Sequence, residues 1–316
     1  MTSAEGPQRT AVLFLHAQTA LHPGSGTALG VVDLPVQRER HTQWPLVPGS
    51  ALKGILRDRC RERAKVNHGG SRKKANEDDA ELVAAFGPAT ADADKHAGAL
   101  AVTDARILAF PVRSLKGVFA WVTCPAVVGR LGRDLVLAHQ AAAPPILNVP
   151  ESNTAICPEH SPLLLDGKQL VLEEFDFTCV ADSGPLAAWV ADHAAHDEFT
   201  RDRLRKHLVV LRDDDFTHFV RHATEVVARI GLDYDKKTVK TGALFYQEFL
   251  PAETLFYALV FANDSRRDGG LLRAADILGY LRGHVPDGSV LQVGGDETIG
   301  KGLCTVRLDC GKEGGE

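Results

Sequence analysis

The chain has 316 residues, enough for about two ordinary domains or one large elaborated domain around a substantial hydrophobic core. Lys and Arg total 36 and Asp and Glu total 41, so the net charge of −5 excludes a uniformly basic coat but not a local basic surface. No segment has the run of about 18 apolar residues that a membrane span needs, and residues 1–10 carry no apolar signal-peptide core. We therefore expect a cytoplasmic protein without a membrane partner, whose six scattered cysteines are reduced.

The first predicted elements are a buried strand and a helix, joined by a long polar loop. Residues 11–15 form an uninterrupted apolar run, which is typical of a buried strand. The helix is expected to begin at Ser50, a good N-cap residue, and to run to about residue 65 with apolar side chains at helical spacing. Residues 66–98 follow, and their polar, charge-segregated first half predicts a mobile surface insertion.

Short strands and helices follow one another irregularly over the rest of the chain. Residues 98–123 predict a strand pair or meander, residues 138–165 an irregular segment, and residues 170–179 a half-exposed strand. Helices are expected over residues 127–137, 186–196, 199–208, 213–230 and 271–281. Further strands are expected over residues 243–249, 254–262, 289–293 and 303–308. Because strands and helices do not alternate regularly and strands open and close the chain, the fold class is α+β rather than doubly wound.

The glycine-rich segment 294–302 is a candidate site. Its spacing matches a phosphate-binding P-loop up to Lys301, but Gly302 stands where a Ser or Thr should hold the metal, and a strand follows in place of a helix. A plain hairpin turn is one interpretation. The interpretation we prefer is a loop pressed against a phosphodiester backbone, because glycines allow close approach and consecutive N–H groups bind anions. The candidate contacts are Gly294, Gly295, Gly300, Lys301 and Gly302.

A basic stripe on the first helix is a second candidate. The stripe consists of Lys53, Arg57 and Arg61, which are spaced four residues apart and so lie on one face. The only acidic residues interleaved with them are Asp58 and Glu62. A solvated charged face is the alternative. A one-sided cationic run that begins near a helix N-terminus also suits the binding of phosphates.

The loop between the first strand and this helix contains a third candidate, Asp33. Val32 and Leu34 flank it, and a lone carboxylate in an apolar frame is costly unless it is paired or functional. A turn-capping role and a functional role both remain open at this point.

Several of these segments together resemble the RAMP superfamily of CRISPR proteins, and within it the backbone subunits of type III-B (Cmr) effector complexes. The motifs lie between residues 12 and 308, nearly the whole chain. They include His22-Pro-Gly-Ser-Gly-Thr27, Gly30-Val-Val-Asp-Leu-Pro-Val-Gln-Arg38, Gly49-Ser-Ala-Leu-Lys-Gly-Ile-Leu-Arg57, Phe110-Pro-Val-Arg-Ser114, Gln247-Glu-Phe-Leu-Pro251 and the glycine loop.

The resemblance implies a fold and an assembly. The fold is a modified RRM- or ferredoxin-like palm, the RAMP fold, built from the N- and C-terminal parts of one domain over residues 1–316. Helical and thumb-like insertions occupy residues 138–245, and the thumb-like part includes residues 230–239. Copies of the chain stack along a CRISPR guide RNA, together with other Cmr subunits, and capture a single-stranded target RNA.

The resemblance also implies an activity and its residues. The target RNA is cut at regular intervals, once per subunit, with a divalent cation such as Mg²⁺ and a 2′,3′-cyclic phosphate product. Asp33 is the implied catalytic residue, His22 and Glu248 are implied assistants, and the basic stripe and the glycine loop match the guide-binding surface. The metal ligands stay unassigned. Because the ribose 2′-OH then attacks its own phosphate, the site needs positioning more than an external nucleophile.

Three rival functions remain open at this stage. One is a filament subunit that does not cut, and another is a guide-processing endonuclease that acts as a monomer on repeat RNA. The third, a nucleotide-hydrolysing enzyme, depends on the incomplete P-loop alone.

Overall fold

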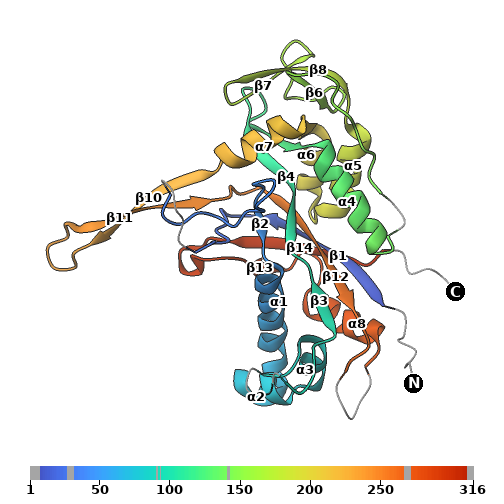
Figure 1. The fold of residues 1–316 in the computed structure, drawn as a ribbon, viewed down its shortest axis with the longest axis vertical. Coiled ribbons are helices and arrows are strands. Elements are labelled where there is room, and N and C mark those ends of the chain that lie inside the picture. Colours follow the sequence, from blue (N-terminus) through green and yellow to red (C-terminus); the bar gives the residue numbers. More distant parts are fainter. Residues whose placement is uncertain are drawn as a thin grey trace.

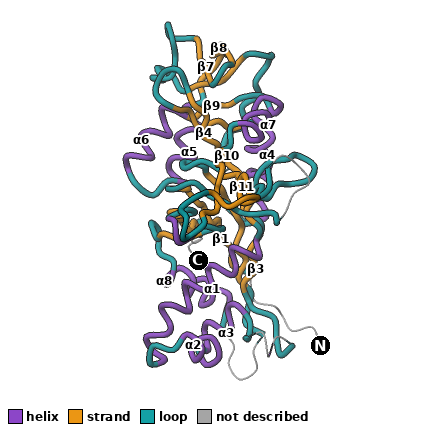
Figure 2. Tube along the Cα trace, turned by 90° about the vertical axis from the view of Figure 1, so that its left-hand side faces the viewer, coloured by secondary structure: helices purple, strands orange, loops and turns teal. Residues whose placement is uncertain are grey.

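The computed structural model describes residues 8–26, 32–89, 92, 94–140, 143–266 and 272–311. These residues form an elongated body from which a β-hairpin projects sideways (Figure 1). Viewed from the side of that hairpin, an upper lobe, a central sheet and a lower helical group follow one another along the long axis (Figure 2). None of the described helices is both long and apolar enough to cross a lipid bilayer.

Four antiparallel strands and two helices form the palm. Strand β1 (Arg9–Ala17) lies between β12 (Leu255–Ala262) and β14 (Leu303–Asp309), and β12 also pairs with β4 (Ala105–Arg113). Helix α1 (Gly49–Ala64) falls between β1 and β4 in the chain, and α8 (Ala274–His284) falls between β12 and β14. The order β14-β1-β12-β4 is that of a ferredoxin-like β-α-β-β-α-β unit, which confirms the predicted α+β palm.

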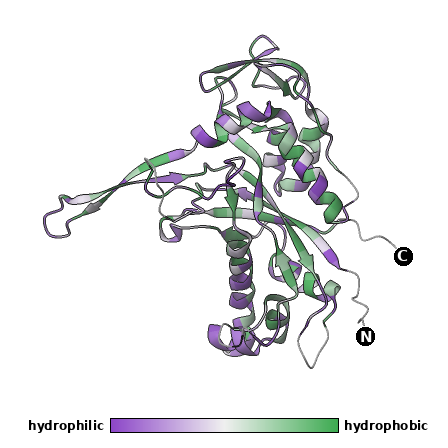
Figure 3. Ribbon diagram, viewed as in Figure 1, coloured by the Kyte–Doolittle hydropathy of each residue, from purple (hydrophilic) through white to green (hydrophobic). Residues whose placement is uncertain are grey.

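The palm sheet is covered on both faces. Every residue of β1 after Arg9 is buried, and helices α5 (Gly184–Ala194) and α8 both contact this strand. A strand that is buried on both faces reads as a continuous apolar run rather than an alternating one, which is why residues 11–15 were recognisable. The central strands are correspondingly the most apolar part of the ribbon (Figure 3).

The upper lobe continues the same sheet beyond β4. Strand β5 (Phe119–Thr123) forms the predicted pair with β4 and runs parallel to β9 (Leu208–Val210). The order continues through β6 (Thr154–Cys157), β8 (Phe175–Asp182) and β7 (Gln169–Leu172). The helices of the lobe are α4 (Pro125–Leu137), α5, α6 (Glu198–His207) and α7 (Asp213–His222). Short strands complete the sheet at β2 (Leu46–Val47), β3 (Leu100–Val102) and β13 (Val290–Gln292).

Two predictions in the upper lobe are wrong in detail. The irregular segment 138–165 contains strand β6, and the single strand expected over residues 170–179 is two strands that pair with each other. Glu173 adopts a φ of 49° and turns the chain between β7 and β8. The sequence gives no warning of that turn, because a non-glycine residue rarely adopts a positive φ.

Within residues 66–98, for which the sequence predicts a mobile insertion, two helices lie between residues 72 and 86. Helix α2 (Arg72–Asp78) is capped by the Ser71 side chain and α3 (Ala80–Phe86) by the Asp79 side chain. The five residues that end α3 are all buried, and α3 packs against α1. A polar composition therefore conceals two good helix caps and one apolar segment that packs against the body. Residues 90, 91 and 93 lie outside the described part of the chain.

The helix predicted over residues 213–230 is wrong beyond His222. Strand β10 (Glu225–Leu232) begins three residues later and pairs with β11 (Val239–Phe249) to form the projecting hairpin. Val226 and Val227, which lie in the segment expected to be helical, are 51% and 40% exposed. Three of the four residues from Thr224 to Val227 are β-branched, which favours a strand, but so short a segment does not distinguish the strand period from the helix period.

The N-cap of helix α1 lies two residues earlier than predicted. Pro48 is its N-cap, Ser50 lies in its first turn, and the Asp104 carboxylate accepts the Gly49 N–H at 2.7 Å. A side chain at Gly49 would place its Cβ 2.5 Å from the Val102 carbonyl oxygen, so glycine is required there. All six cysteines are free thiols, and four of them are buried.

Candidate functional site

Three segments that are distant in the sequence meet where the hairpin leaves the body. The loop after β1 forms bridges from Leu21 to Leu250 and from Leu34 to Gln247, so it follows the inner end of β11. The glycine loop, which joins β13 to β14, donates the Gly295 N–H to the His22 carbonyl at 3.0 Å. Hydrogen bonds to β11 and to the glycine loop therefore bring Asp33, His22, Glu248 and the glycine loop together at the inner end of the hairpin.

Asp33 is held at the edge of β11 with its carboxylate exposed. Its Oδ2 accepts the Tyr246 N–H at 2.8 Å, and the next residue, Leu34, exchanges backbone hydrogen bonds with Tyr246 and Glu248. The expected apolar frame is therefore wrong, because an extended segment along a strand edge turns this side chain to solvent. Gly30 and Val31 of the motif lie outside the described residues. A fixed, exposed carboxylate is available to a bound substrate.

His22 is buried and has a defined tautomer. Its Nδ1 lies 2.7 Å from the backbone oxygen of Glu248, and since a carbonyl only accepts, the proton of the neutral ring is on Nδ1. The ring packs against Phe249 with 5.5 Å between centroids. A Cβ built on Gly24 would lie 2.9 Å from Nε2, so this nitrogen faces backbone that carries no side chain. The unprotonated Nε2 is a potential proton acceptor.

Glu248 uses its carboxylate to hold the loop. Its Oε1 accepts from Arg38 at 2.6 Å and its Oε2 accepts from the Val36 N–H at 3.0 Å, and the residue is 6% exposed. Arg38 also donates to the backbone oxygens of Gln43 and Val220. These contacts indicate that Glu248 positions the segment containing Asp33 rather than exchanging protons with a substrate.

The glycine loop is shaped by its contact with the His22 segment. A Cβ at Gly294 would lie 2.3 Å from the His22 carbonyl oxygen, and one at Gly302 would lie 2.0 Å from the Val293 carbonyl oxygen. Both residues also adopt positive φ, at 84° and 74°. The Lys301 ammonium lies 5.0 Å from the centroid of the Phe249 ring, against which His22 also packs. The loop therefore adds a cation beside His22.

Three residues that the sequence analysis did not single out complete the site. The Asp296 carboxylate accepts from Arg229 at 2.8 Å and from Gln247 at 2.6 Å. Burial opposes ionisation of this carboxyl, but the two hydrogen bonds and the Arg229 charge hold its pKa below the ordinary value. Gln247 belongs to a motif quoted above, and the run Thr224-Glu-Val-Val-Ala-Arg229 also contributes to the resemblance, but the sequence analysis gave neither Gln247 nor Arg229 a role.

The basic stripe of α1 does not join this site. Lys53 donates to the Leu100 carbonyl at 2.8 Å, Arg57 donates to Asn76 and Pro88, and Arg61 pairs with Asp58. Burial, and then the neighbouring Arg57, lower the pKa of Lys53. The stripe is thus used to attach β3 and the α2–α3 region to α1, and its predicted RNA contacts stay a prediction.

The opposite face of α1 faces the glycine loop across a groove of about 600 Å³. Arg59 supplies a cation to its wall, while Asp58 and Glu62 form ion pairs with Arg72. The residues that line the groove are Ala51, Gly54, Ile55, Asp58, Arg59, Glu62, Val290, Leu291, Gln292, Gly294 and Glu297.

The site has limited capacity for a metal ion. Among the described residues, no three His, Cys, Asp or Glu side chains are grouped as a metal site would require. Asp33 offers an exposed carboxylate, whereas those of Glu248 and Asp296 are bonded to Arg38 and Arg229. Mg²⁺ keeps several waters and binds through one or two carboxylates together with substrate phosphates. Of these three carboxylates, Asp33 is therefore the one that is open to a hydrated cation.

Comparison with known proteins identifies similar chains along almost the whole length. The family model described as the RAMP superfamily matches residues 14–305. The CRISPR system Cmr endoribonuclease Cmr4 of Pyrococcus furiosus is 39% identical over 300 residues, covering 93% of this chain and 94% of that protein. The CRISPR system CMR subunit Cmr4 of Saccharolobus solfataricus is 24% identical over 314 residues, with 93% and 94% covered.

Solved structures agree with this similarity. The crystal structure of oligomeric Cmr4 from Pyrococcus furiosus matches with a TM-score of 0.69 and 30% identity, covering 95% of this chain and 98% of that one. A chain of the type III-B Cmr-beta complex bound to cognate target RNA matches with a TM-score of 0.70 over 95% and 96% of the two chains. That second match is 22% identical, so it bears on the fold alone.

Proposed function

The chain belongs to the RAMP superfamily, and from that membership we propose that it is the backbone subunit and endoribonuclease of a type III-B CRISPR effector complex. Its partners are then a CRISPR guide RNA, a complementary target RNA, other copies of itself and the other Cmr subunits, in the cytoplasm. The observation that carries the proposal is the convergence of Asp33 and His22 on β11, in a chain 39% identical to a named Cmr endoribonuclease.

The surface supports binding through the RNA backbone. We place the guide in the groove between α1 and the glycine loop, because Arg59 lines the groove, Lys301 lies on that loop, and the loop glycines carry no side chains. The target strand then passes the base of the hairpin, where Asp33 is exposed. Sequence is read by pairing between guide and target, so the protein needs to recognise shape and phosphates alone.

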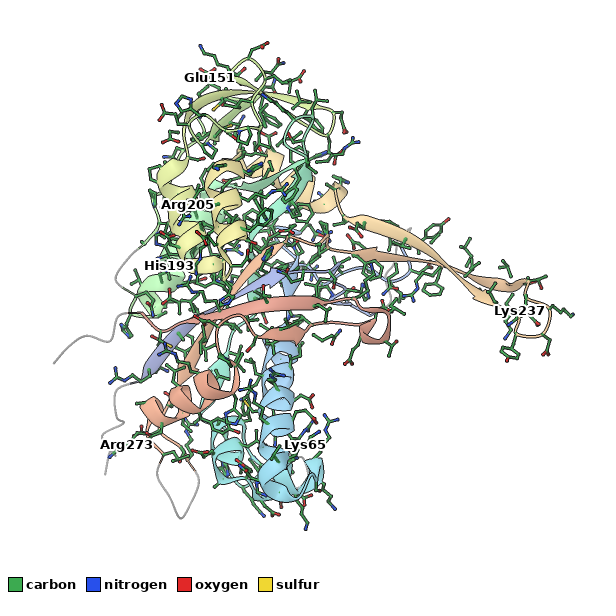
Figure 4. The ribbon with its side chains drawn as sticks, turned by 180° about the vertical axis from the view of Figure 1, so that it is seen from behind. Lys65, Glu151, His193, Arg205, Lys237 and Arg273 are labelled. Carbon is green, nitrogen blue, oxygen red and sulfur yellow. The ribbon has the colours of Figure 1, made fainter. Side chains whose placement is uncertain are left out.

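The projecting hairpin is suited to contact the paired strands. One face of the hairpin carries four apolar or aromatic side chains that are between 40% and 54% exposed, namely those of Val226, Ile230, Leu244 and Tyr246. Lys237 lies at its tip, far from the body (Figure 4). Apolar side chains on a protruding element can insert between base steps and unstack them. Unstacking frees a ribose and its phosphate to rotate, which an in-line attack by the 2′-OH requires.

The proposed reaction is transfer of the phosphate within one nucleotide. A bond forms between the 2′ oxygen and phosphorus, the bond from phosphorus to the 5′ oxygen breaks, and the products are a 2′,3′-cyclic phosphate and a 5′-hydroxyl. The Nε2 of His22 accepts the 2′-OH proton, and the leaving oxygen takes a proton from water. Asp33 orients the reacting group, directly or as ligand to a hydrated Mg²⁺ that would neutralise phosphate charge.

The test is to map the cuts made by the assembled complex. The complex, loaded with one guide, is incubated with end-labelled complementary RNA in Mg²⁺, with non-complementary RNA and EDTA as controls. We expect cuts at regular intervals that shift when the guide is shifted, and products whose ends resist phosphatase until the cyclic phosphate is opened. Absence of cutting would favour a non-catalytic filament subunit. Cutting of repeat RNA by the isolated chain would favour guide processing.

A further inference from the structure

Arg229, Gln247 and Asp296 form a closed set of hydrogen bonds between the hairpin and the glycine loop. One nitrogen of Arg229, Nη1, donates to the Gln247 side-chain oxygen at 2.5 Å and to Asp296 at 2.8 Å. Gln247 in turn donates to the other Asp296 oxygen at 2.6 Å. Each of the three side chains therefore bonds to both of the others, although they come from β10, β11 and the loop after β13.

Asp296 also shapes the loop to which it belongs. Its backbone oxygen accepts the N–H groups of Ile299 at 3.1 Å and Lys301 at 3.2 Å. It adopts a φ of 64°, a conformation that Asp tolerates better than most residues. The side chain is 19% exposed, so its bonds to Arg229 and Gln247 are partly shielded from water. Fixing Asp296 therefore fixes the segment from Gly295 to Lys301.

These contacts complete a ring around His22. The His22 carbonyl accepts from Gly295, which precedes Asp296, and the His22 Nδ1 donates to the carbonyl of Glu248, which follows Gln247. The bond from Gln247 to Asp296 joins the two sides. The glycine loop thus holds the His22 backbone, and β11 holds the His22 ring. The bond between Gln247 and Asp296 keeps the loop and β11 in place relative to each other.

We propose that Arg229, Gln247 and Asp296 act as a positioning clamp for target cleavage, holding the glycine loop against β11 so that His22 keeps its ring orientation beside Asp33. This inference depends on the proposed endoribonuclease function. The clamp residues do not touch the reacting atoms; they act through His22. Because the clamp also joins the guide-facing loop to the hairpin, it makes correct seating of the loop a condition for cleavage.

The experiment compares clamp variants in the assembled complex. Arg229→Met, Asp296→Asn and the double variant are loaded with guide RNA, and the single-turnover cleavage rate is measured over a range of target concentrations. Glu174→Gln removes one carboxylate charge from an exposed residue between β7 and β8 of the upper lobe, away from the groove and the glycine loop, and serves as the control. Arg229→Lys keeps the charge but replaces the planar guanidinium with a compact ammonium on a flexible stem. Guide affinity and Tm are measured for every variant.

We expect each single clamp variant to lower the saturating rate about ten- to hundredfold, the cost of a small misplacement of a reacting group. The target concentration for half-maximal rate, the guide affinity and the Tm should stay close to those of the control. The double variant should lose no more than either single variant, because the three residues act as one unit. Arg229→Lys should recover part of the rate.

Two outcomes would overturn the clamp while leaving the endoribonuclease intact. One is a wild-type complex that cuts and clamp variants that cut equally fast. The other is loss of Tm and guide affinity in parallel with rate, which would make the three residues a plain structural contact. A wild-type complex that does not cut would refute the proposed function itself.

Discussion

The position of His22 depends on glycine neighbours, because a side chain on them would collide with the residue. The residue is 8% exposed, and a Cβ on Gly24 would lie only 2.9 Å from its Nε2. The Gly24 backbone does not adopt a positive φ, so an alanine there would be resisted by the imidazole and not by the backbone. A Gly24→Ala variant therefore tests the contribution of the His22 ring nitrogen to cleavage without straining the backbone at residue 24.

We predict that Gly24→Ala lowers target cleavage by about tenfold or more, because the new Cβ displaces Nε2 from its position. Guide binding and Tm should change little. Gly132→Ala on α4 is the control, since a Cβ at Gly132 meets nothing within 4 Å. Gel analysis of single-turnover cleavage with matched complexes is the measurement. Full activity in Gly24→Ala would exclude His22 Nε2 as the proton acceptor.

At this scale the sequence identified residues better than it identified their surroundings. The motif around Asp33 located the carboxylate, but its exposure depends on β11, which is more than 200 residues away in the chain. The sequence analysis recognised Glu248 as an assistant in catalysis but did not predict its ion pair with Arg38, because that pair is a tertiary contact. Asp296 was overlooked because the sequence analysis assigned the function of its loop to the glycines and Lys301. No local pattern encodes a hydrogen bond between distant segments.

Among the elements, helix α1 uses its two faces differently. Lys53 and Arg57 bond to protein oxygens, whereas Arg59 lines the groove beside the glycine loop. The face that looked cationic in the sequence is therefore committed to the fold. The face toward the groove was not recognised, because it carries small residues and acidic side chains that are paired with Arg72.

We predict opposite results for the two faces. Lys53→Ala with Arg57→Ala should lower stability by about 1–2 kcal/mol through lost hydrogen bonds and leave the salt dependence of guide binding unchanged. Arg59→Ala should weaken binding of every guide alike and flatten the plot of log affinity against log salt by roughly 0.7 for one lost phosphate contact. Thermal unfolding and filter binding at several salt concentrations decide between them. A flattened slope in the double variant alone would restore the basic stripe as the guide surface.

The hairpin is an element that the sequence analysis recovered only in part. Residues 230–239 were assigned to a thumb-like insertion through the family resemblance, while the propensity-based reading extended a helix to residue 230. The structure gives its strands as Glu225–Leu232 and Val239–Phe249. Periodicity failed here because an exposed hairpin has no buried face to impose alternation.

Shortening the hairpin should remove function without harming the fold. Ile230 and Leu244 are directly paired, so residues 231–243 can be replaced by an Asn-Gly turn that keeps Arg229 and the inner part of β11 from Leu244 to Phe249. We predict a Tm within about 2 °C of the wild type, because the removed residues are exposed or half-buried. Cleavage of the bound target should fall at every site. An unchanged cleavage pattern would mean that the outer part of the hairpin, residues 231–243, is not needed for cleavage.

At the scale of the whole molecule, the palm was the most predictable part. Its central strands β1 and β12 are buried on both faces, so they appear as apolar runs in the sequence, and the resemblance supplied the strand order. The upper lobe and the lower helices were less predictable. Their elements are short, and each segment contributes only a few apolar residues to the core. Burial in these regions is a property of the assembled molecule rather than of any one segment.

We predict that the purified chain associates with itself and that guide RNA lengthens the assembly. Contacts between unlike surfaces that do not close into a ring produce open helical arrays, and each subunit would cover a fixed length of guide. Multi-angle light scattering with guides of several lengths should give a mass that rises with guide length. One protomer, or one closed oligomer whatever the guide, would contradict the filament and favour a guide-processing monomer.

The central claim is that this chain cuts target RNA through the site at the hairpin base, and Asp33→Asn tests it most directly. Asparagine keeps an oxygen that can accept the Tyr246 N–H, so the loop should stay in place while the charge is lost. The measurement maps cuts in complementary RNA by complexes that contain either chain. The account predicts that the variant complex assembles, binds guide and target with unchanged affinity, and makes none of the regularly spaced cuts. Undiminished cutting by the Asp33→Asn complex would contradict it.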